Sequence, residues 1–571
     1  MPVEDARRSP RTVSTDVCVI GAGPAGLTVA HECLDAGFRI LVLEGGRYEE
    51  DADAQALADA TMESTFYKTD AIAGGRRRQF GGTATSWAHV TKPGTDRVYA
   101  RTLPGEAVDF ERKSWQPTSG WPIGLDDLAP WYERAHVTWT GTSMDNEVGN
   151  WVGPTTPELP LQGGPLITRM AQFGAGDVFS HRYRDDLSAA PQATVMLDST
   201  VVSLDSDGDG QRIRRATVRR SDGSTFTVTA EVFVLAGGGI ENVQTLLLSE
   251  STRPGAVGNR HDNVGRYVTD HPEFRMGTIV PSDRGLIDRI GLYDMHYVGD
   301  SMVNGLLTLR EDVKREHELL NTGAVLVPRP AGFGTPAERS LRSLRLQARR
   351  KPVEDPYRHT WSLITAPADA AAVVRSQLSQ RAAARDSHPR GYAWYLGGWS
   401  RPDADRSGFR VLEVHVAAEQ TPHRDNQVTL TADRDALGRQ KVRCSLEWAP
   451  DDQENLVRGM TLFQAEIARA GIGRFDPWID FTTITHPVQT GFHHPMGGTR
   501  MHEDPALGVV DADCRVHGLD NLYLAGSSVF TTSLGYSNPT LTVIALATRL
   551  ADHVKEVLTG HPAVAVGIPA S

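Results

Sequence analysis

The sequence predicts a mixed α/β fold, with a parallel βαβ unit near its N-terminal end and an antiparallel region in its middle. Two apolar β-rich runs are joined by a glycine turn and an amphipathic helical pattern in STDVCVIGAGPAGLTVAHECLDAGFRILVLEGG. Polar and apolar residues then alternate between about 275 and 485, as in QVTLTADRDALGRQKVRCSLEW. Near the C-terminus a further short strand, LYL, precedes a long apolar helical segment that begins after Pro539.

The composition is that of an ordinary globular protein, with 571 residues of which 40% are hydrophobic and 23% are charged. The net charge of −12 disfavours nucleic acid and anionic membranes as main partners. Since no apolar run approaches the roughly 18 residues that span a bilayer, we expect no stable membrane insertion. The basic stretch ERSLRSLRLQARRKP, Glu338 to Pro352, could form an amphipathic helix that touches a membrane or a partner, although a solvated helix or lid is favoured.

The cysteine pattern predicts a reducing, cytoplasmic environment. Four cysteines are scattered without a CxxC pair or zinc-ligand spacing, so neither a disulfide framework nor a bound metal is expected. The polar N-terminus, MPVEDARRSPRTVST, contains an arginine pair, but no separate apolar region follows as in an export signal. It is therefore interpreted as a disordered leader.

The first motif predicts a bound dinucleotide. Gly21 permits a tight turn after the first strand, Gly23 lets backbone N–H groups approach a pyrophosphate, and Gly26 allows close contact between helix and strand. Glu44 follows the second strand, 18 positions after Gly26, where an acidic residue can bind ribose hydroxyls. The motif leaves open whether the ligand is NAD(H) or FAD.

The next element is expected to be a hairpin over Thr200 to Gly223, in which DSDGDG forms the turn. A calcium loop is disfavoured because the closing glutamate is missing. Farther along, the stretch FVLAGGG is expected to be another strand that enters glycines, and Gln427 to Trp448 a second hairpin that turns around Asp435 to Gly438.

Seven ordered blocks carry a resemblance to a known family: FGGTATSW, SGWPIGLDDLAPWYERA, FVLAGGGIENVQTLLLS, NVGRYVTDHP, AEQTPHRDNQVTL, HHPMGGTRM and NLYLAGSSVFTTSLGYSNPTLTVIALATRLADH. The sequence resembles the glucose-methanol-choline (GMC) oxidoreductases, and within them the branch of bacterial pyranose oxidases and glycoside 3-oxidases. The resemblance implies FAD rather than NAD as the cofactor.

The resemblance also implies a discontinuous FAD-binding domain and a substrate domain built on an antiparallel sheet covered by helices. Residues 1–274 would form the first parts of the FAD-binding domain, with an excursion into the substrate domain near 100–190. Residues 275–485 would form the substrate-binding domain, with an insertion at about 330–390. Residues 486–571 would complete the FAD-binding domain and carry the catalytic residues.

Further cofactor contacts are implied by the same blocks. The glycine loop would contact the flavin through Gly82, Thr83 and Ser86. Ser86 stands where pyranose 2-oxidase has the histidine that bonds the flavin covalently, so non-covalent FAD is expected, although His89 could substitute. The remaining contacts implied by the family pattern are Val201, Ala236, Gly526, Asn538 and Thr540.

The chemistry expected of such a site is alcohol oxidation, in which a hydride passes to flavin N5 and a base removes the hydroxyl proton. A neutral histidine is suited to that role. The family pattern assigns it to His494 and pairs it with Asn538, while the altered glycine spacing of HHPMGGTRM keeps His493 as a competitor. His493 is expected on the opposite face, because adjacent strand residues point to opposite sides. Weaker candidates for contacts to substrate hydroxyls are Gln420 and His423, and His493 as well.

The expected reaction is oxidation of a secondary hydroxyl of a pyranose sugar or glycoside, at C3 or C2, to the keto sugar. An aminoglycoside, an inositol or a sterol is the alternative substrate. Oxygen, a quinone or another carrier would accept the electrons, and no oligomeric state is predicted.

Overall fold

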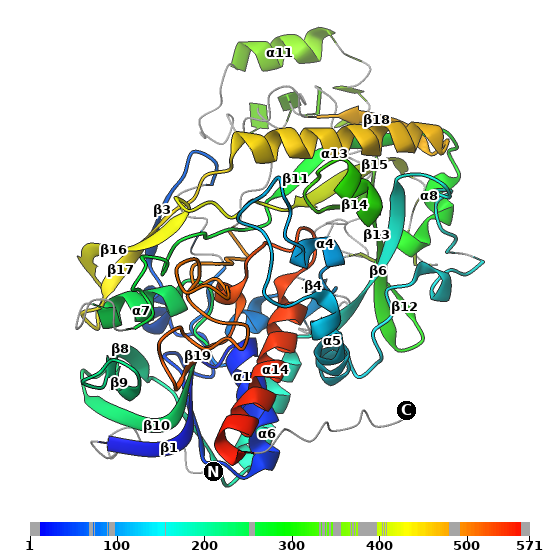
Figure 1. The fold of residues 1–571 in the computed structure, drawn as a ribbon. Helices are drawn as coiled ribbons and strands as arrows, with labels where there is room; N and C mark the ends of the chain where they lie inside the picture. The colour runs from blue at the N-terminus through cyan, green and yellow to red at the C-terminus, as the bar shows by residue number, and fades with distance from the viewer. Residues whose placement is uncertain are drawn as a thin grey trace.

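The structure is a computed structural model, and it describes most of the chain between residues 12 and 560. The described residues are 12–67, 72, 75–87, 89–90, 98–154, 156–250, 257–330, 356–365, 397–401, 408–478 and 492–560, with scattered positions between 333 and 406. Its strands form three sheets, and the two larger sheets lie in the lower and upper parts of the molecule as drawn in Figure 1.

The first sheet is the nucleotide-binding sheet, with strand order β7-β2-β1-β10-β9-β8 and β19 paired to β10. Its strands are β1 (Thr12–Ile20), β2 (Ile40–Leu43), β7 (Ala193–Met196), β8 (Thr200–Ser206), β9 (Ile213–Arg219), β10 (Thr225–Leu235) and β19 (Leu522–Leu524). β1 runs parallel to both β2 and β10, and its last four residues are buried. A strand that is buried on both faces has a continuous run of apolar residues, and such a run, VCVI, predicted β1. The predicted βαβ unit and the β8–β9 hairpin are confirmed.

The second sheet has nine strands and follows the order β18-β11-β15-β14-β13-β6-β5-β4, with β12 paired to β13. Its strands are β4 (His89–Val90), β5 (Val98–Thr102), β6 (Leu166–Ala175), β11 (Glu273–Pro281), β12 (His296–Val298), β13 (Ser301–Leu309), β14 (Thr322–Pro330), β15 (Phe409–Ala418) and β18 (Gly473–Pro477). All of its pairings are antiparallel. The mixed α/β fold class is therefore confirmed.

The third sheet corrects one expectation. The hairpin of β16 (Gln427–Arg434) and β17 (Gln440–Ser445) forms as predicted. It does not join the nine-stranded sheet, because β17 pairs in parallel with β3 (Ala60–Glu63) from the N-terminal part of the chain. Alternation in a sequence predicts a hairpin but not the strand that it meets.

Helices cover the sheets and connect the two ends of the chain. They are α1 (Pro24–Glu32), α2 (Ala52–Ala56), α4 (Ala107–Phe110), α5 (Leu125–Thr140), α6 (Tyr183–Ala189), α7 (Glu241–Glu250), α8 (Leu286–Arg289), α9 (Glu311–Glu316), α11 (Pro356–Thr365), α13 (Pro450–Arg469) and α14 (Pro539–Thr559). The C-terminal helix α14 packs between α1 and α5, and it crosses the middle of the view in Figure 1. It begins at Pro539 itself, where the sequence predicted a start just after this proline.

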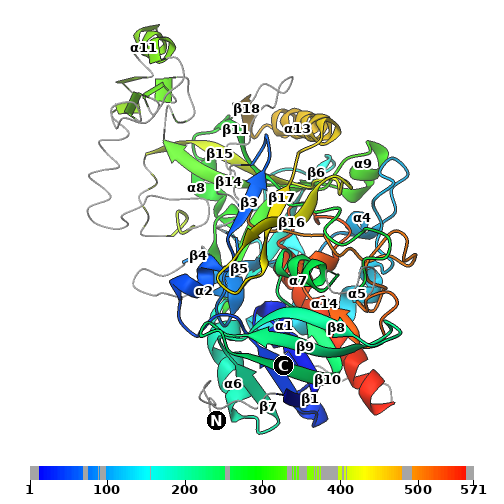
Figure 2. The same cartoon turned by 90° about the vertical axis from the view of Figure 1, so that its left-hand side faces the viewer.

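The long helix α13 runs across the top of the nine-stranded sheet in Figure 1. Its buried residues Leu456, Met460 and Phe463 recur at helical spacing and give it one apolar face. α11 stands apart from the sheets in Figures 1 and 2. Most of the basic stretch from Glu338 to Pro352 lies outside the described residues. In the described part of the chain, no helix combines the length and apolar character that crossing a bilayer requires.

Candidate active site

A cavity of about 600 Å³ is lined by residues from both large sheets and from the start of α14. The glycine turn after β1, the end of β2 and the end of β10 lie at the carboxyl ends of parallel strands, where α/β sheets bind ligands. Most of the predicted cofactor residues line this cavity: Gly21, Gly23, Glu44, Gly82, Thr83, Ser86, Val201, Ala236, Gly526, Asn538 and Thr540. The fold thus gathers residues from blocks spread along the whole chain.

Gly21, Gly26 and Gly82 leave no room for a side chain. Gly21 has φ +112°, and a Cβ there would lie 2.5 Å from the Ala236 carbonyl oxygen. A Cβ on Gly82, which has φ +54°, would lie 2.9 Å from the Cα of Gly23. Gly26 does not line the cavity; a Cβ there would lie 2.0 Å from the Gly21 carbonyl oxygen, so it serves the packing of α1 on β1.

Glu44 is held in place at the end of β2 by two backbone donors. The N–H of Ala22 donates to its Oε2 at 2.9 Å, and the N–H of Gly46 donates to its Oε1 at 2.7 Å. Burial raises the pKa of this carboxyl. Each oxygen keeps a second lone pair for a ligand hydroxyl in the cavity, as ribose binding requires.

The start of α14 faces the same cavity. Asn538 is its N-cap, and Asn538, Pro539, Thr540 and Val543 all line the cavity. The first backbone N–H groups of a helix have no partners within the helix, and its N-terminus carries partial positive charge. This end of the cavity is therefore suited to electron-rich oxygens.

These features fit FAD on structural grounds. The glycine turn and Gly82 form a cradle that a single Cβ would fill, Glu44 offers acceptors at the end of β2, and α14 supplies N–H donors farther along. Ser86 donates its hydroxyl proton to the Thr83 carbonyl oxygen at 3.2 Å. The side chain of His89 lies outside the described part of the chain.

His494 is held by a second histidine, His271. The Nδ1 atom of His494 lies 2.5 Å from Nε2 of His271, and the ring centroids are 4.5 Å apart with an interplanar angle of 83°. Burial and the neighbouring charge of His271 lower the pKa of His494 well below its usual range. Burial likewise lowers the pKa of His271 to about 4. Both imidazoles are therefore neutral at pH 7.

The buried carboxyl of Asp270 lies next to this histidine pair and accepts a backbone hydrogen bond from it. The Asp270 Oδ1 accepts the backbone N–H of His271 at 2.8 Å, and burial raises the pKa of Asp270 to about 7. Gln420 lies there too, since its Oε1 accepts the N–H of Asp270 at 3.0 Å. Among the described residues, ligand atoms of Asp270, His271 and His494 lie within 4.8 Å of one another. The two histidines already bond to each other, and the absence of a metal remains a prediction.

Three expectations about polar residues need correction. His493 lines the same cavity as His494, because residues 492–495 form a loop and not a strand with alternating faces. Gln420 is fully buried and donates to the Glu447 carbonyl oxygen at 2.9 Å, so it does not reach the cavity. His423 lines a separate open hollow beside Glu63 and Glu447. A residue's polar character did not reveal which way its side chain points.

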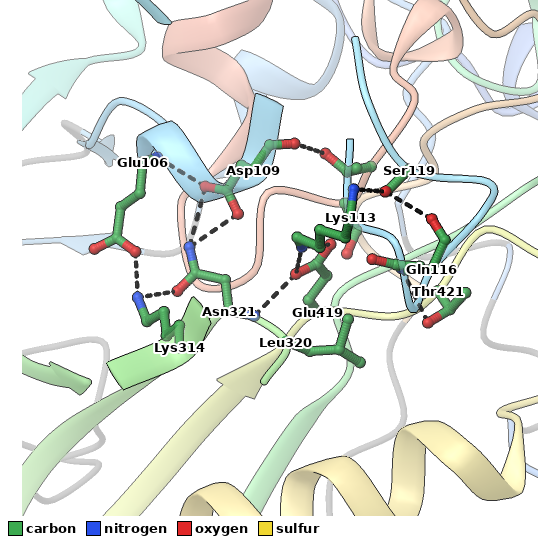
Figure 3. Close-up of polar contacts among 12 residues, drawn as sticks. Glu106, Asp109, Lys113, Gln116, Ser119, Lys314, Leu320, Asn321, Glu419 and Thr421 are labelled. Carbon is green, nitrogen blue, oxygen red and sulfur yellow. Dashed lines mark hydrogen bonds and ion pairs between the residues drawn. The ribbon is translucent and has the colours of Figure 1, made fainter. Parts of the chain in front are cut away.

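A buried polar cluster beside the cavity was missed by the sequence. Figure 3 shows Lys314 between Glu106 and Asn321, with Asp109 on the far side of Asn321. The Lys314 side chain is 1% exposed, and its ammonium group pairs with Glu106 and donates to Asn321 Oδ1 at 2.6 Å. Lys314 and Glu106 are 208 positions apart in the sequence, so no local sequence pattern predicts that they pair.

This cluster fixes the segment that leads into α14. Tyr536, which lines the cavity, donates its hydroxyl proton to Glu106 Oε1 at 2.7 Å. Ser537 donates to the Pro104 carbonyl oxygen at 3.0 Å, and Thr532 donates to the Asp109 carbonyl oxygen at 3.1 Å. The loop from 104 to 121 therefore holds residues 532–537 directly before Asn538.

Comparisons with known proteins agree with this geometry. A family model described as an FAD binding domain matches residues 16–265, and one described as GMC oxidoreductase matches residues 422–547. The fructose dehydrogenase large subunit of Gluconobacter japonicus is 22% identical over 96% of this chain and 98% of its own length. Paromamine 6'-oxidase of Streptomyces fradiae is 23% identical over 96% of this chain and 93% of its own length. A structure of formate oxidase from Aspergillus oryzae RIB40 superposes over 97% of this chain and 100% of its own, with a TM-score of 0.51 and 15% identity, which shows a likeness of fold alone.

Proposed function

Because the chain belongs to the GMC oxidoreductases, FAD-dependent enzymes that act on CH–OH groups, we propose that it oxidises a secondary hydroxyl of a pyranose sugar or glycoside, at C2 or C3, to the ketone. The observation that carries the proposal is a neutral His494, held by His271, in the same cavity as the dinucleotide-binding glycine turn. The similarity to fructose dehydrogenase and paromamine 6'-oxidase supports a polyhydroxylated substrate.

In this proposal the cofactor is held by Gly21, Gly23 and Glu44 at one part of the cavity and by Gly82 and the start of α14 at another. Bound FAD supplies the acceptor for the two electrons that leave the carbinol carbon as hydride. The partial positive charge at the N-terminus of α14 stabilises negative charge that develops in the cavity.

His494 removes the hydroxyl proton. The Nδ1 of His271 is buried and has no hydrogen-bond partner among the described residues. With the His271 proton on this Nδ1, the Nε2 of His271 accepts the Nδ1–H of His494. The Nε2 of His494 then keeps a free lone pair for the substrate hydroxyl. Asn538 donates a hydrogen bond to the oxygen as it loses its proton.

The flavin is non-covalent in this proposal, because the hydroxyl of Ser86 is engaged with the Thr83 carbonyl oxygen and is no nucleophile at neutral pH. Acid precipitation tests this: the yellow colour should stay in the supernatant. Flavin that remains with the pellet would contradict it and direct attention to His89.

The electron acceptor is proposed to be oxygen or a small carrier such as a quinone. A cytoplasmic location is part of the same proposal, supported by four cysteines that are free and buried.

A second candidate substrate is an aminoglycoside, favoured by the similarity to paromamine 6'-oxidase over 96% of this chain. An inositol or a sterol is the remaining alternative. Anaerobic mixing with a panel of pyranoses, methyl glycosides, aminoglycosides, inositols and sterols distinguishes them, because an oxidisable alcohol bleaches the visible flavin absorption. Bleaching by pyranoses or their glycosides is expected. Bleaching by aminoglycosides, inositols or sterols, with no response to pyranoses or their glycosides, would refute the sugar proposal.

A further inference from the structure

Two oppositely charged side chains of the nine-stranded sheet face the cavity without an ion pair. Glu273 begins β11, Arg101 lies on β5, and both line the cavity together with His494. Arg101 is 7% exposed, and its Nε has no hydrogen-bond partner among the described residues. Within the same part of the chain, the Glu273 carboxylate makes no hydrogen bond and no ion pair. Glu273 is partly exposed to the cavity, whereas Arg101 is buried, and a buried guanidinium nitrogen is rarely left without a partner unless a ligand supplies one.

The sheet around Glu273 leaves space for a ligand. Glu273 is paired in register with Ala417 on β15, and Ala417 is paired with Gly323 on β14. Paired residues of adjacent strands share a face, so the neighbours of Glu273 on this face are small. Tyr536 packs over Gly323, where a Cβ would lie 2.3 Å from its ring. The sheet next to Glu273 therefore carries only the small residues Ala417 and Gly323 on this face, with the Tyr536 ring over Gly323.

The two charges act on each other and on the histidine pair. Burial raises the pKa of Glu273 to about 7, and the Arg101 charge opposes that rise. Arg101 also contributes to the lowered pKa values of His271 and His494. Both residues line the cavity together with His271 and His494, on the wall that belongs to the nine-stranded sheet and not to the nucleotide-binding sheet.

We propose that Glu273 and Arg101 form the subsite that recognises the substrate hydroxyls which are not oxidised. A carboxylate accepts hydrogen bonds from two neighbouring hydroxyls, and a guanidinium donates to hydroxyl or ring oxygens. The subsite takes a neutral cyclic polyol, which supplies both donors and acceptors. An ammonium group is disfavoured, because it would meet the fixed positive charge of Arg101 beside the carboxylate.

This inference rests on the proposed function and narrows its substrate class from alcohols in general to neutral polyols. It also separates the two candidate substrates, since amino sugars carry ammonium groups at neutral pH. D-glucosamine should therefore bind more weakly than D-glucose, and the difference should shrink in Arg101→Met.

Binding is tested apart from oxidation in the His494→Ala holoenzyme. Isothermal titration measures Kd for D-glucose, D-galactose, D-xylose, their methyl glycosides and cyclohexanol, which has a single hydroxyl. Adding Glu273→Gln or Arg101→Met should weaken the tightest pyranose by roughly 10- to 100-fold, the loss typical of hydrogen bonds to charged groups. The Kd for cyclohexanol should rise by less than about threefold, because its single hydroxyl makes no hydrogen bond to Glu273 or Arg101 that the variants would remove. Glu231→Gln, a change of an exposed glutamate, is the matched control.

Each outcome decides a question. Equal losses for the pyranose and cyclohexanol, or no loss for either, would overturn the subsite while leaving the proposed function intact. A pyranose that binds through Glu273 and Arg101 but never bleaches the wild-type flavin supports the subsite and contradicts the proposed function. Failure of every pyranose to bind overturns both. Flavin content and melting temperature show that each variant is folded.

Discussion

The imidazole of His271 stands almost perpendicular to that of His494, with its Nε2 2.5 Å from the Nδ1 of His494. The bond orients the ring of His494, whose Nε2 has no hydrogen bond to any described residue. It also joins two loops that are 223 positions apart in the sequence. The following predictions test the roles of this pair and of the residues that hold the cavity.

His494→Ala should lower the anaerobic rate of flavin reduction by about 10²- to 10⁴-fold, the usual effect of losing a general base. Stopped-flow absorbance measures this rate directly. His493→Ala is the matched comparison, because His493 lines the same cavity without a described hydrogen bond, and a loss of less than about tenfold is expected there. The reverse order of effects would assign the base to His493.

His271→Ala should change the pH profile as well as the rate. Burial and the His271 charge keep the pKa of His494 well below its usual range, so His494, the proposed base, stays neutral at mildly acidic pH. Without His271 the pKa of His494 rises, and the rate falls at a higher pH than in the wild type. His271→Asn should restore much of the rate, because an amide oxygen can accept the same hydrogen bond. An unchanged acid limb in His271→Ala would show that His271 has no influence on the base.

Gly23→Ala should abolish FAD binding while the protein still folds. Gly23 has an ordinary negative φ, and the nearest protein atom to an added Cβ would be the Gly82 Cα at 4.0 Å. The added methyl group would occupy the space that the pyrophosphate needs. Flavin absorbance per protein and circular dichroism measure the two properties. Gly37→Ala is the control, since it has φ +75° with open space around it, and it should retain flavin. Full flavin content in Gly23→Ala would place the pyrophosphate elsewhere.

Acid should weaken the fold through Glu106. Burial alone would raise the pKa of its carboxyl, but the charges of Lys314 and Arg169 outweigh burial and hold the pKa at about 2. A depressed pKa gives stability above the ordinary value of 4.5, and this stability is lost as pH falls towards 2. Glu106→Gln should cost about 3–5 kcal/mol at pH 7, because it leaves Lys314 buried without its ion pair.

Thermal melts at pH 7 and at about pH 2.5, near the lower end of this window, measure this effect. Glu311→Gln, which removes an exposed pair with Arg315, should cost less than about 1 kcal/mol. Equal losses in the two variants would show that the buried pair adds no particular stability.

Local spacing was enough to predict the glycine turn, Glu44 and the start of α14, because each of these roles depends on residues close together in the chain. The contact between His271 and His494 could not be predicted, since it depends on how two distant loops meet. The same holds for Lys314 and Glu106.

Gln420 shows a different limit: a polar residue at a strand end points inward or outward according to register, and register is set by the neighbouring strand. Glu273 was missed because its small neighbours become apparent only from the pairing of β11, β15 and β14.

The bonds between the loop at 104–121 and residues 532–537 have a consequence for biosynthesis. A ribosome completes the glycine turn, β2 and the loop early, but Tyr536, Asn538 and α14 emerge last. Until then Glu106 and Asp109 lack partners from the final segment, and the nascent chain has an incomplete wall beside the flavin pocket. Stable retention of the cofactor is therefore a late event, and a chain that ends before residue 532 should emerge colourless even though it contains the entire nucleotide-binding motif.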